Sequence, residues 1–305
     1  MTDTNKKVAD GSIYMFAGKG GVGKTTCAAT TALHYAGQGQ KTIAISTDAT
    51  PSLAHIFEVA DKKRATRIND SLYINEIGLD EVQQMWDMKF GKEVHEVFSS
   101  FVSIDYDSFV EFMTSMLPGL SDEFMVDYIR EMKKSGKYET VIWDTAPLGQ
   151  TLALLHTPAM LVEHLKMAPR IYSRLKFGQN SRRSILEILK RWQKLSADSI
   201  DFLRQEVRFN IVTIAEALAF EQLDDIFKQL DDHGFAVSQL IVNNVIKADN
   251  SEFLKMKASQ QRKYLDMIHG RYGHLNIIEL PMRPYEIKGV ERLKEVEANL
   301  FEQGL

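Results

Sequence analysis

Short apolar runs without strict alternation recur along the whole chain. They are rich in isoleucine and valine, and they lie at residues 13–16, 41–47, 72–77, 139–143, 208–214, 239–245 and 275–280. Such runs are typical of parallel strands that are covered by helices on both faces. An alanine-rich stretch at 25–36 predicts a helix directly after the first strand. The pattern therefore predicts an α/β fold with a doubly wound, mostly parallel sheet.

The pattern changes between residues 80 and 134. From Phe90, apolar side chains recur at i+4, i+7, i+8 and i+11, which predicts an inserted helix. Eight of the chain's 13 methionines lie between residues 85 and 167. Pliable thioethers suit a groove that accepts varied apolar helices, whereas a methionine stripe at helical spacing is also typical of a core. If the stripe is a groove, its candidate lining residues are Met85, Met88, Met113, Met116 and Met125.

A second amphipathic stretch, at residues 178–195, carries arginines and lysines around an apolar stripe. Such a helix can lie on a membrane, bind an acidic partner, or expose a solvated face over a core. These three interpretations stay open on the residues alone.

A phosphate-binding loop follows the first strand. The segment Gly18–Thr25 reads GKGGVGKT and satisfies the pattern GxxxxGK[ST] at Gly18, Gly23, Lys24 and Thr25. In such loops backbone N–H groups surround a triphosphate, the lysine reaches the β and γ phosphates, and the hydroxyl binds Mg²⁺. The predicted strand before the loop and the predicted helix after it also agree with a phosphate-binding loop, because they place the phosphates at a helix N-terminus. The predicted nucleotide-binding residues of this segment are Gly18, Lys19, Gly20, Gly21, Val22, Gly23, Lys24, Thr25 and Thr26.

Two further strand ends carry acids, where ligands of doubly wound sheets bind. Asp48 follows the strand at 41–47 and is predicted to position or activate the attacking water, or to hold a water on the Mg²⁺; by itself it could equally cap a helix. Asp144 follows the strand at 139–143 and is placed like a Walker B acid, which meets Mg²⁺ through water. ATP and Mg²⁺ are therefore the expected ligands, and Asp48, Lys24 and Lys19 the expected catalytic residues.

Composition narrows the class of protein. Apolar residues make up 44% and charged residues 26% of the 305, and no apolar run approaches the roughly 20 residues that cross a bilayer. The N-terminus lacks the apolar core of a secretory signal, so we expect a cytoplasmic protein. A net charge of −4 gives no overall attraction for nucleic acid. The single cysteine, Cys27, excludes an intrachain disulfide and a CxxC site, and its simplest interpretation is a small buried residue.

The additional lysine of the loop, Lys19, gives the motif KGGxGK[ST], which resembles that of the deviant-loop ATPases. DTAPLGQTLALL at 144–155 narrows the resemblance to the ArsA family, the arsenite-pump and tail-anchored-protein-targeting ATPases, and the chain is most similar to their single-half targeting type. The resemblance runs from about residue 12 to 293. It implies a P-loop ATPase core at 1–79, 136–157 and 207–305, and a helical subdomain at 80–135 and 158–206.

The same resemblance implies roles for partners and residues. Lys19 would cross a homodimer interface to the partner's nucleotide, Asn243 would recognise adenine, and the loop that begins with Pro281 and Met282 would pack around the base. Without the other motifs, Asn243 could equally be a buried or capping residue. The helical insertions of two protomers would form the site for the transmembrane helix of a tail-anchored client, which is delivered to a membrane receptor.

The chain departs from the family pattern in switch I and in the dimer clasp. DATPSLAH at 48–55 stands where the family has DPAHSLSD, and Gln150 replaces a frequent histidine. The CxxC that bridges eukaryotic targeting dimers through zinc is missing, so no zinc is expected.

An ATP-driven targeting chaperone is the leading interpretation. An arsenite-pump ATPase is the close alternative, but family pumps use metalloid-binding cysteines in the helical region, and this chain has none there. A partition-type positioning ATPase usually needs a basic face or a membrane helix at the C-terminus. A nucleotide-gated holdase that has lost hydrolysis is the fourth possibility.

Overall fold

The structure is a computed structural model, and it describes residues 13–48, 52–60, 65–99, 105–110, 120–146, 163, 166–167, 179–247 and 251–301. The chain divides into two compact units. The first, here called the sheet unit, comprises residues 1–76, 132–148 and 204–305. The second, the helical unit, comprises residues 77–131 and 149–203. No described helix is both long enough and apolar enough to cross a membrane.

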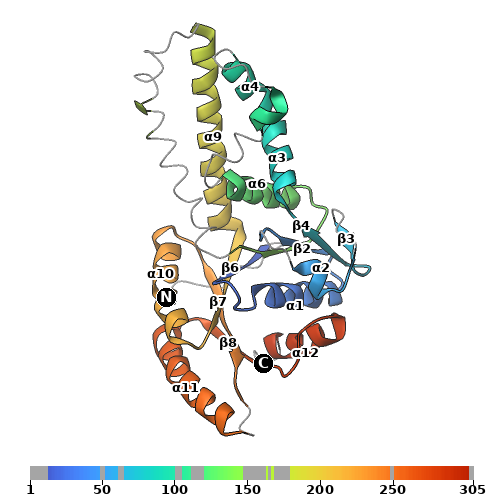
Figure 1. The fold of residues 1–305 in the computed structure, drawn as a ribbon, viewed down its shortest axis with the longest axis vertical. Coiled ribbons are helices and arrows are strands. Elements are labelled where there is room, and N and C mark those ends of the chain that lie inside the picture. Colours follow the sequence, from blue (N-terminus) through green and yellow to red (C-terminus); the bar gives the residue numbers. More distant parts are fainter. Residues whose placement is uncertain are drawn as a thin grey trace. The chain divides into compact units, whose positions relative to one another are not determined.

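One sheet organises the sheet unit, with the strand order β3-β4-β2-β5-β1-β6-β7-β8 (Figure 1). All neighbours pair in parallel except β3 and β4, so the predicted α/β fold with a mostly parallel sheet is confirmed. The two-residue antiparallel strand β3 was not expected. The strands are β1 (Ile13–Gly18), β2 (Thr42–Ser46), β3 (Thr66–Arg67), β4 (Leu72–Glu76), β5 (Thr140–Asp144), β6 (Val207–Ile214), β7 (Val237–Val245) and β8 (Asn276–Pro281).

The helices of the sheet unit are α1 (Lys24–Gly37), α2 (Leu53–Ile56), α10 (Ala217–Asp232), α11 (Glu252–Tyr272) and α12 (Val290–Phe301). The helical unit contains α3 (Leu79–Trp86), the π-helix η1 (Asp87–Gly91), α4 (Lys92–Ser99), most of α6 (Leu120–Lys134) and most of α9 (Gln179–Glu206). The apolar stripe that predicted one helix from Phe90 onward thus begins within the π-helix η1. In a π-helix the backbone hydrogen bonds join residues i and i+5.

Helix α1 packs against β2, β5 and α12 on one face of the sheet (Figure 1). Its inward residues are small, with Ala28, Ala29 and Ala32 fully buried, so the helix axis lies close to the strands. Every residue of β2 and β5 is buried, which explains why these runs lack polar alternation. This packing fixes the N-terminus of α1 at the carboxyl ends of β1 and β5.

The helical unit has an aromatic core of its own. The ring centroids of Trp86 and Phe109 are 5.9 Å apart, and Phe90 lies 6.0 Å from Phe124 and 6.4 Å from Trp192. Spacings of this kind are favourable for aromatic pairs. Because these rings come from α3, η1, the segment 105–110, α6 and α9, they join segments far apart in the sequence into one unit.

Candidate nucleotide site

The loop between β1 and α1 requires glycine at its two ends. A Cβ on Gly18 would lie 2.1 Å from the backbone oxygen of Val212 on the neighbouring strand β6. Gly23, at the N-cap of α1, has φ +98°, and a Cβ there would lie 2.2 Å from Nδ2 of Asn243. Since neither position has room for a side chain, the loop closes tightly around the N-terminus of α1, where anions bind.

The two lysines of the loop are placed differently. Lys24 is 6% exposed, and its Nζ donates to the backbone oxygen of Lys19 at 3.1 Å. Burial lowers the pKa of Lys24, while the negative charges of Asp144 and Asp48 oppose this shift. Lys19 has an exposed side chain. The buried ammonium is therefore available to a phosphate inside the loop, and the exposed one to a group outside it.

Asp144 lies at the carboxyl end of β5, in register with Phe16 of β1 and Ser46 of β2. It is 1% exposed, and its Oδ2 accepts from the Ser46 hydroxyl at 3.3 Å. The pKa of Asp144 is raised to about 7: burial and the charge of Asp48 raise it, and the nearby Thr25 hydroxyl, Lys24 and Ser46 partly oppose this shift. This carboxylate is thus held, at an energetic cost, next to the phosphate loop.

The residues fit a magnesium ion. Oδ1 of Asp144 is buried and has no hydrogen-bond partner among the described residues, and Thr25, whose hydroxyl such loops give to Mg²⁺, lies beside it. Mg²⁺ takes few protein ligands and keeps phosphates and waters. When bound, it would offset the charge that develops on the phosphates.

Asp48 lies immediately beyond β2. The backbone N–H of Thr47 donates to the Asp144 carbonyl at 3.0 Å, and the Thr47 hydroxyl accepts from the indole of Trp143 at 3.0 Å. Asp48 is half-buried, close enough to influence the pKa values of Lys24 and Asp144. It does not cap the next helix, since α2 begins at Leu53 with another residue, Ser52, at its N-cap. The charge of Asp48 thus acts on both Lys24 of the phosphate loop and Asp144.

Two more predicted segments lie at the carboxyl ends of β7 and β8. Asn243, on β7, donates through Nδ2 to the backbone oxygen of Val22 at 2.9 Å. Pro281 ends β8 in register with Val245, and the N–H of Met282 donates to the Val245 carbonyl at 2.9 Å. The Met282 side chain is 44% exposed. Because β1, β7 and β8 are parallel, the phosphate loop, Asn243 and the 281–282 segment lie at the same edge of the sheet.

The sequence profile of the anion-transporting ATPase family, the ArsA ATPases, matches residues 12–302. The chain belongs to this family. It is 27% identical over 291 residues to "Putative arsenical pump-driving ATPase 2" of Aquifex aeolicus, covering 93% of this chain and 97% of that protein. It is also 27% identical to "ATPase GET3A" of Arabidopsis thaliana, with 91% and 80% covered, and 25% identical to "ATPase GET3" of Pyricularia oryzae, with 91% and 87% covered. The reaction of this ArsA-family protein is ATP hydrolysis.

Contacts that the sequence did not predict hold α2 of this ArsA ATPase. The N–H of Ala54 donates to Glu76 Oε1 at 2.9 Å, and the other carboxylate oxygen of Glu76 is buried without a partner in the described structure. On the opposite side, the N–H of Gly289 donates to the Ile56 carbonyl at 2.8 Å, and His55 lies 3.4 Å from Glu286. The sequence signal that could have predicted the first contact is Glu76 itself, an acidic residue at the end of an apolar strand. Helix α2 is therefore held between the end of β4 and the segment 286–289.

The methionines proposed for a client groove fall into different environments. Met88, in η1, is 79% exposed, Met85 is half-buried, and Met125, in α6, is 9% exposed. Met113 and Met116 lie outside the described residues. Met88 therefore fits a groove, whereas Met125 in this conformation fits the alternative interpretation, a core.

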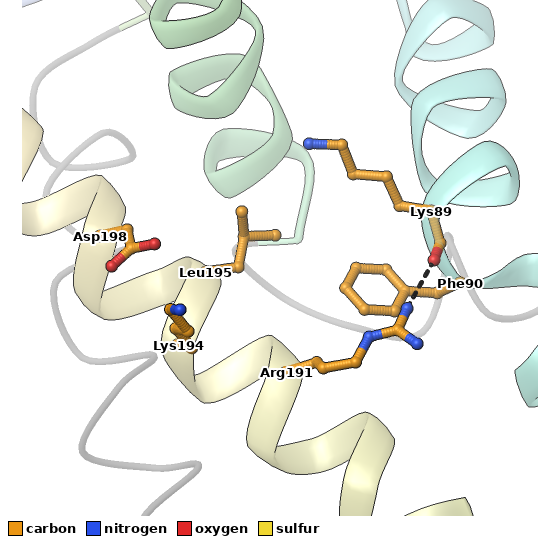
Figure 2. A pocket seen from close by; sticks show the side chains of 6 residues that line it. All are labelled: Lys89, Phe90, Arg191, Lys194, Leu195 and Asp198. Atoms are coloured by element: carbon orange, nitrogen blue, oxygen red, sulfur yellow. Dashed lines mark hydrogen bonds between the residues drawn. The ribbon is translucent and has the colours of Figure 1, made fainter.

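Residues 179–195 of the basic stretch lie on α9, where Arg191 has contacts within the helical unit (Figure 2). Its guanidinium donates to Glu93 at 2.6 Å and to the Lys89 carbonyl at 3.1 Å, and lies 5.5 Å from the centroid of the Phe90 ring. A pocket of about 280 Å³ opens beside these residues. Figure 2 shows Lys194, Leu195 and Asp198 of the same helix along it. Arg191 thus serves helix packing inside the unit.

Proposed function

We propose that this ATPase is a homodimeric targeting chaperone, which shields the transmembrane helix of tail-anchored proteins and delivers them to a membrane receptor. The names of its relatives divide between arsenical pump-driving and GET3 ATPases. Because ATP hydrolysis is common to both groups, the choice depends on what the chain binds besides ATP.

The environment of Cys27 favours the targeting function over the arsenite-pump function. Arsenite is a thiophile, and soft metal and metalloid ions are held by thiolates. Cys27, the single cysteine of the 305 residues, lies in α1 and is 0% exposed. Burial, together with the charge of Asp144, raises the pKa of its thiol to about 12. An inaccessible, protonated thiol cannot hold a metalloid, which disfavours the arsenite-pump alternative.

The exposed thioether of Met88 supports a client surface in the helical unit. Met88 is 79% exposed and lies in the π-helix η1. Methionine adapts its shape to different apolar partners, and π-helices are frequent at functional sites. A transmembrane helix of variable sequence is a partner of this kind.

The geometry of the sheet unit supports ATP-driven closure. In the proposed cycle Lys24 binds the transferred phosphoryl group inside its own loop, while exposed Lys19 reaches the nucleotide of the second protomer. Asp48 orients the attacking water, and Thr25 with Asp144 holds Mg²⁺. Loss of the γ phosphate would then change the position of Asp48, and the contacts of α2 with Glu76 and Gly289 would pass this change on.

Client capture tests the proposal. The chaperone and a tagged tail-anchored protein are co-expressed, and complexes are isolated with a non-hydrolysable ATP analogue or with ADP. We expect capture that requires both the analogue and an apolar tail helix, and that falls at least about threefold in Met88→Gln, because an exposed apolar contact is worth roughly 1 kcal/mol. Met256→Gln, a 61% exposed methionine on α11, is the matched control.

Two outcomes would contradict the proposal. One is equal capture of a test protein whose tail helix has been made polar. The other is stimulation of hydrolysis by arsenite, lost in Cys27→Ser, which would favour the pump-driving function instead.

A further inference from the structure

The end of β7, next to Asn243, is poorly supported by the sheet. The pairing of β7 with β8 shifts register between Val242 and Val245, so that Asn243 and Asn244 fall within the irregularity. Asn244 has φ +58°, in the left-handed region that non-glycine residues seldom adopt. The backbone therefore turns sharply one residue after Asn243, at a point where the regular strand ladder is interrupted.

Gln261 supplies the missing support from α11. Its Nε2 donates to the Asn244 carbonyl at 2.9 Å, and its Oε1 accepts from the N–H of Ile246 at 2.8 Å. A carbonyl oxygen only accepts and an N–H only donates, so these two contacts fix which end of the Gln261 amide faces which backbone group. One side chain thus binds both sides of the turn.

The orientation of the Asn243 side-chain amide follows from its hydrogen-bond partner in the same way. Its Nδ2 faces the carbonyl oxygen of Val22, which can only accept, so Oδ1 is the atom left for a base. At position 6 adenine presents an amino group, which donates, whereas guanine presents a carbonyl, which accepts. An Asn243 held in this orientation is complementary to adenine and repels guanine.

Hydrogen bonds, more than close packing, hold Gln261 in place. Helix α11 buries Leu265, Ile268 and Tyr272 in its C-terminal half. Gln261 lies one turn before Leu265 and lines a pocket of about 390 Å³, together with Ala258, Val245 and Ile246. Because the side chain borders a cavity, its replacement leaves the core of the helix intact.

We propose that Gln261 is a positioning residue for base recognition: by fixing the turn at Asn244 it keeps Asn243 oriented for ATP and against GTP. The inference rests on the proposed contact between Asn243 and adenine. Gln261 itself touches no nucleotide in this arrangement, and its effect is transmitted through two backbone hydrogen bonds and one residue of chain.

The test compares ATP with GTP hydrolysis in four full-length proteins: wild type, Gln261→Met, Gln261→Glu and Gln260→Met. Methionine has the length of glutamine but forms neither hydrogen bond, and glutamate keeps only the acceptor for Ile246. Gln260 is exposed on the same helix and is the matched control. We expect both Gln261 variants to lose at least about tenfold in the ratio of kcat/KM for ATP over GTP, mainly through KM for ATP, with Gln260→Met unchanged.

Different failures are distinguishable. An unchanged ATP preference in both Gln261 variants would overturn the positioning role. A wild type without any preference for ATP would overturn the contact between Asn243 and adenine, and the inference with it. Equal losses of kcat for ATP and GTP, with a lowered melting temperature, would show a merely structural role. None of these measurements involves a client, so the targeting function is tested separately by the capture experiment.

Discussion

The buried ammonium of Lys24 donates to the backbone carbonyl of Lys19, whose own side chain is exposed. Two lysines five residues apart in one loop therefore have different surroundings. Lys24 already touches the loop that encloses a triphosphate, and Lys19 extends from its outer surface. This difference separates the effects expected from removing each charge.

Lys24→Ala should lower the rate of ATP hydrolysis at least about 10²-fold. Removal of one preorganised charge at the transferred phosphoryl group lowers kcat by about this factor. Lys19→Ala should instead retain ATP binding by the monomer and lose dimerisation induced by ATP. Sedimentation velocity with a non-hydrolysable analogue measures the second effect, with Lys19→Arg as the charge-conserving control. A nucleotide-dependent dimer in Lys19→Ala would remove Lys19 from the interface.

Asp48→Asn should retain ATP binding and slow hydrolysis by roughly 10²–10⁴-fold, the range expected for loss of a positioned general base. The slowed step keeps ATP in place, so the closed dimer should accumulate. Phosphate release under single-turnover conditions checks the rate. Asp70→Asn, an exposed acid in a turn of the same unit, is the control, and normal turnover in Asp48→Asn would assign the attacking water to another residue.

Asp144 should make the nucleotide-free protein less stable as pH rises. Its pKa is raised from 3.8 to about 7 in the folded state. Between these values the folded protein binds a proton that the unfolded chain does not, so this contribution to stability is present at low pH and is lost as pH rises towards 7. Asp144→Asn lacks the titrating group.

The free energy of unfolding of Asp144→Asn relative to wild type should therefore increase from pH 4 to pH 7, by at most about 1.4 kcal/mol per pH unit. Urea unfolding without nucleotide or magnesium measures the difference. A difference that is independent of pH would show that Asp144 stays ionised throughout this range.

Cys27 should not react with iodoacetamide in the native protein at pH 8, since its thiol is buried and its pKa is raised to about 12. Labelling should become complete once guanidinium unfolds the chain. Ser259→Cys places a second thiol on the exposed face of α11 and should be labelled in the native state, which controls for the reagent. Stoichiometric native labelling of wild type would contradict the burial that disfavours a metalloid site.

The mostly parallel sheet could be predicted from the apolar runs, because a strand buried on both faces shows its burial in every residue. The sequence also predicts that the loop at 18–25 and the acids Asp48 and Asp144 lie at one edge of the sheet, while their roles toward a nucleotide stay predictions. Their spacing follows from local geometry, and parallel strands bring their carboxyl ends to one edge. Strand β3 was missed because two residues give no period, and the π-helix was missed because a helical stripe does not show how hydrogen bonds step along the backbone.

The sequence by itself determined the fold class and the family, because both depend on residue types at fixed local spacing. Only the tertiary structure decided that Asn243 meets Val22 across 221 residues, that Glu76 holds the N–H of Ala54, and that Gln261 supports the turn after Asn243. It also decided that Met125 is buried and Met88 exposed. These outcomes depend on which strands become neighbours and how far each ladder continues, and no local period encodes such long-range pairing.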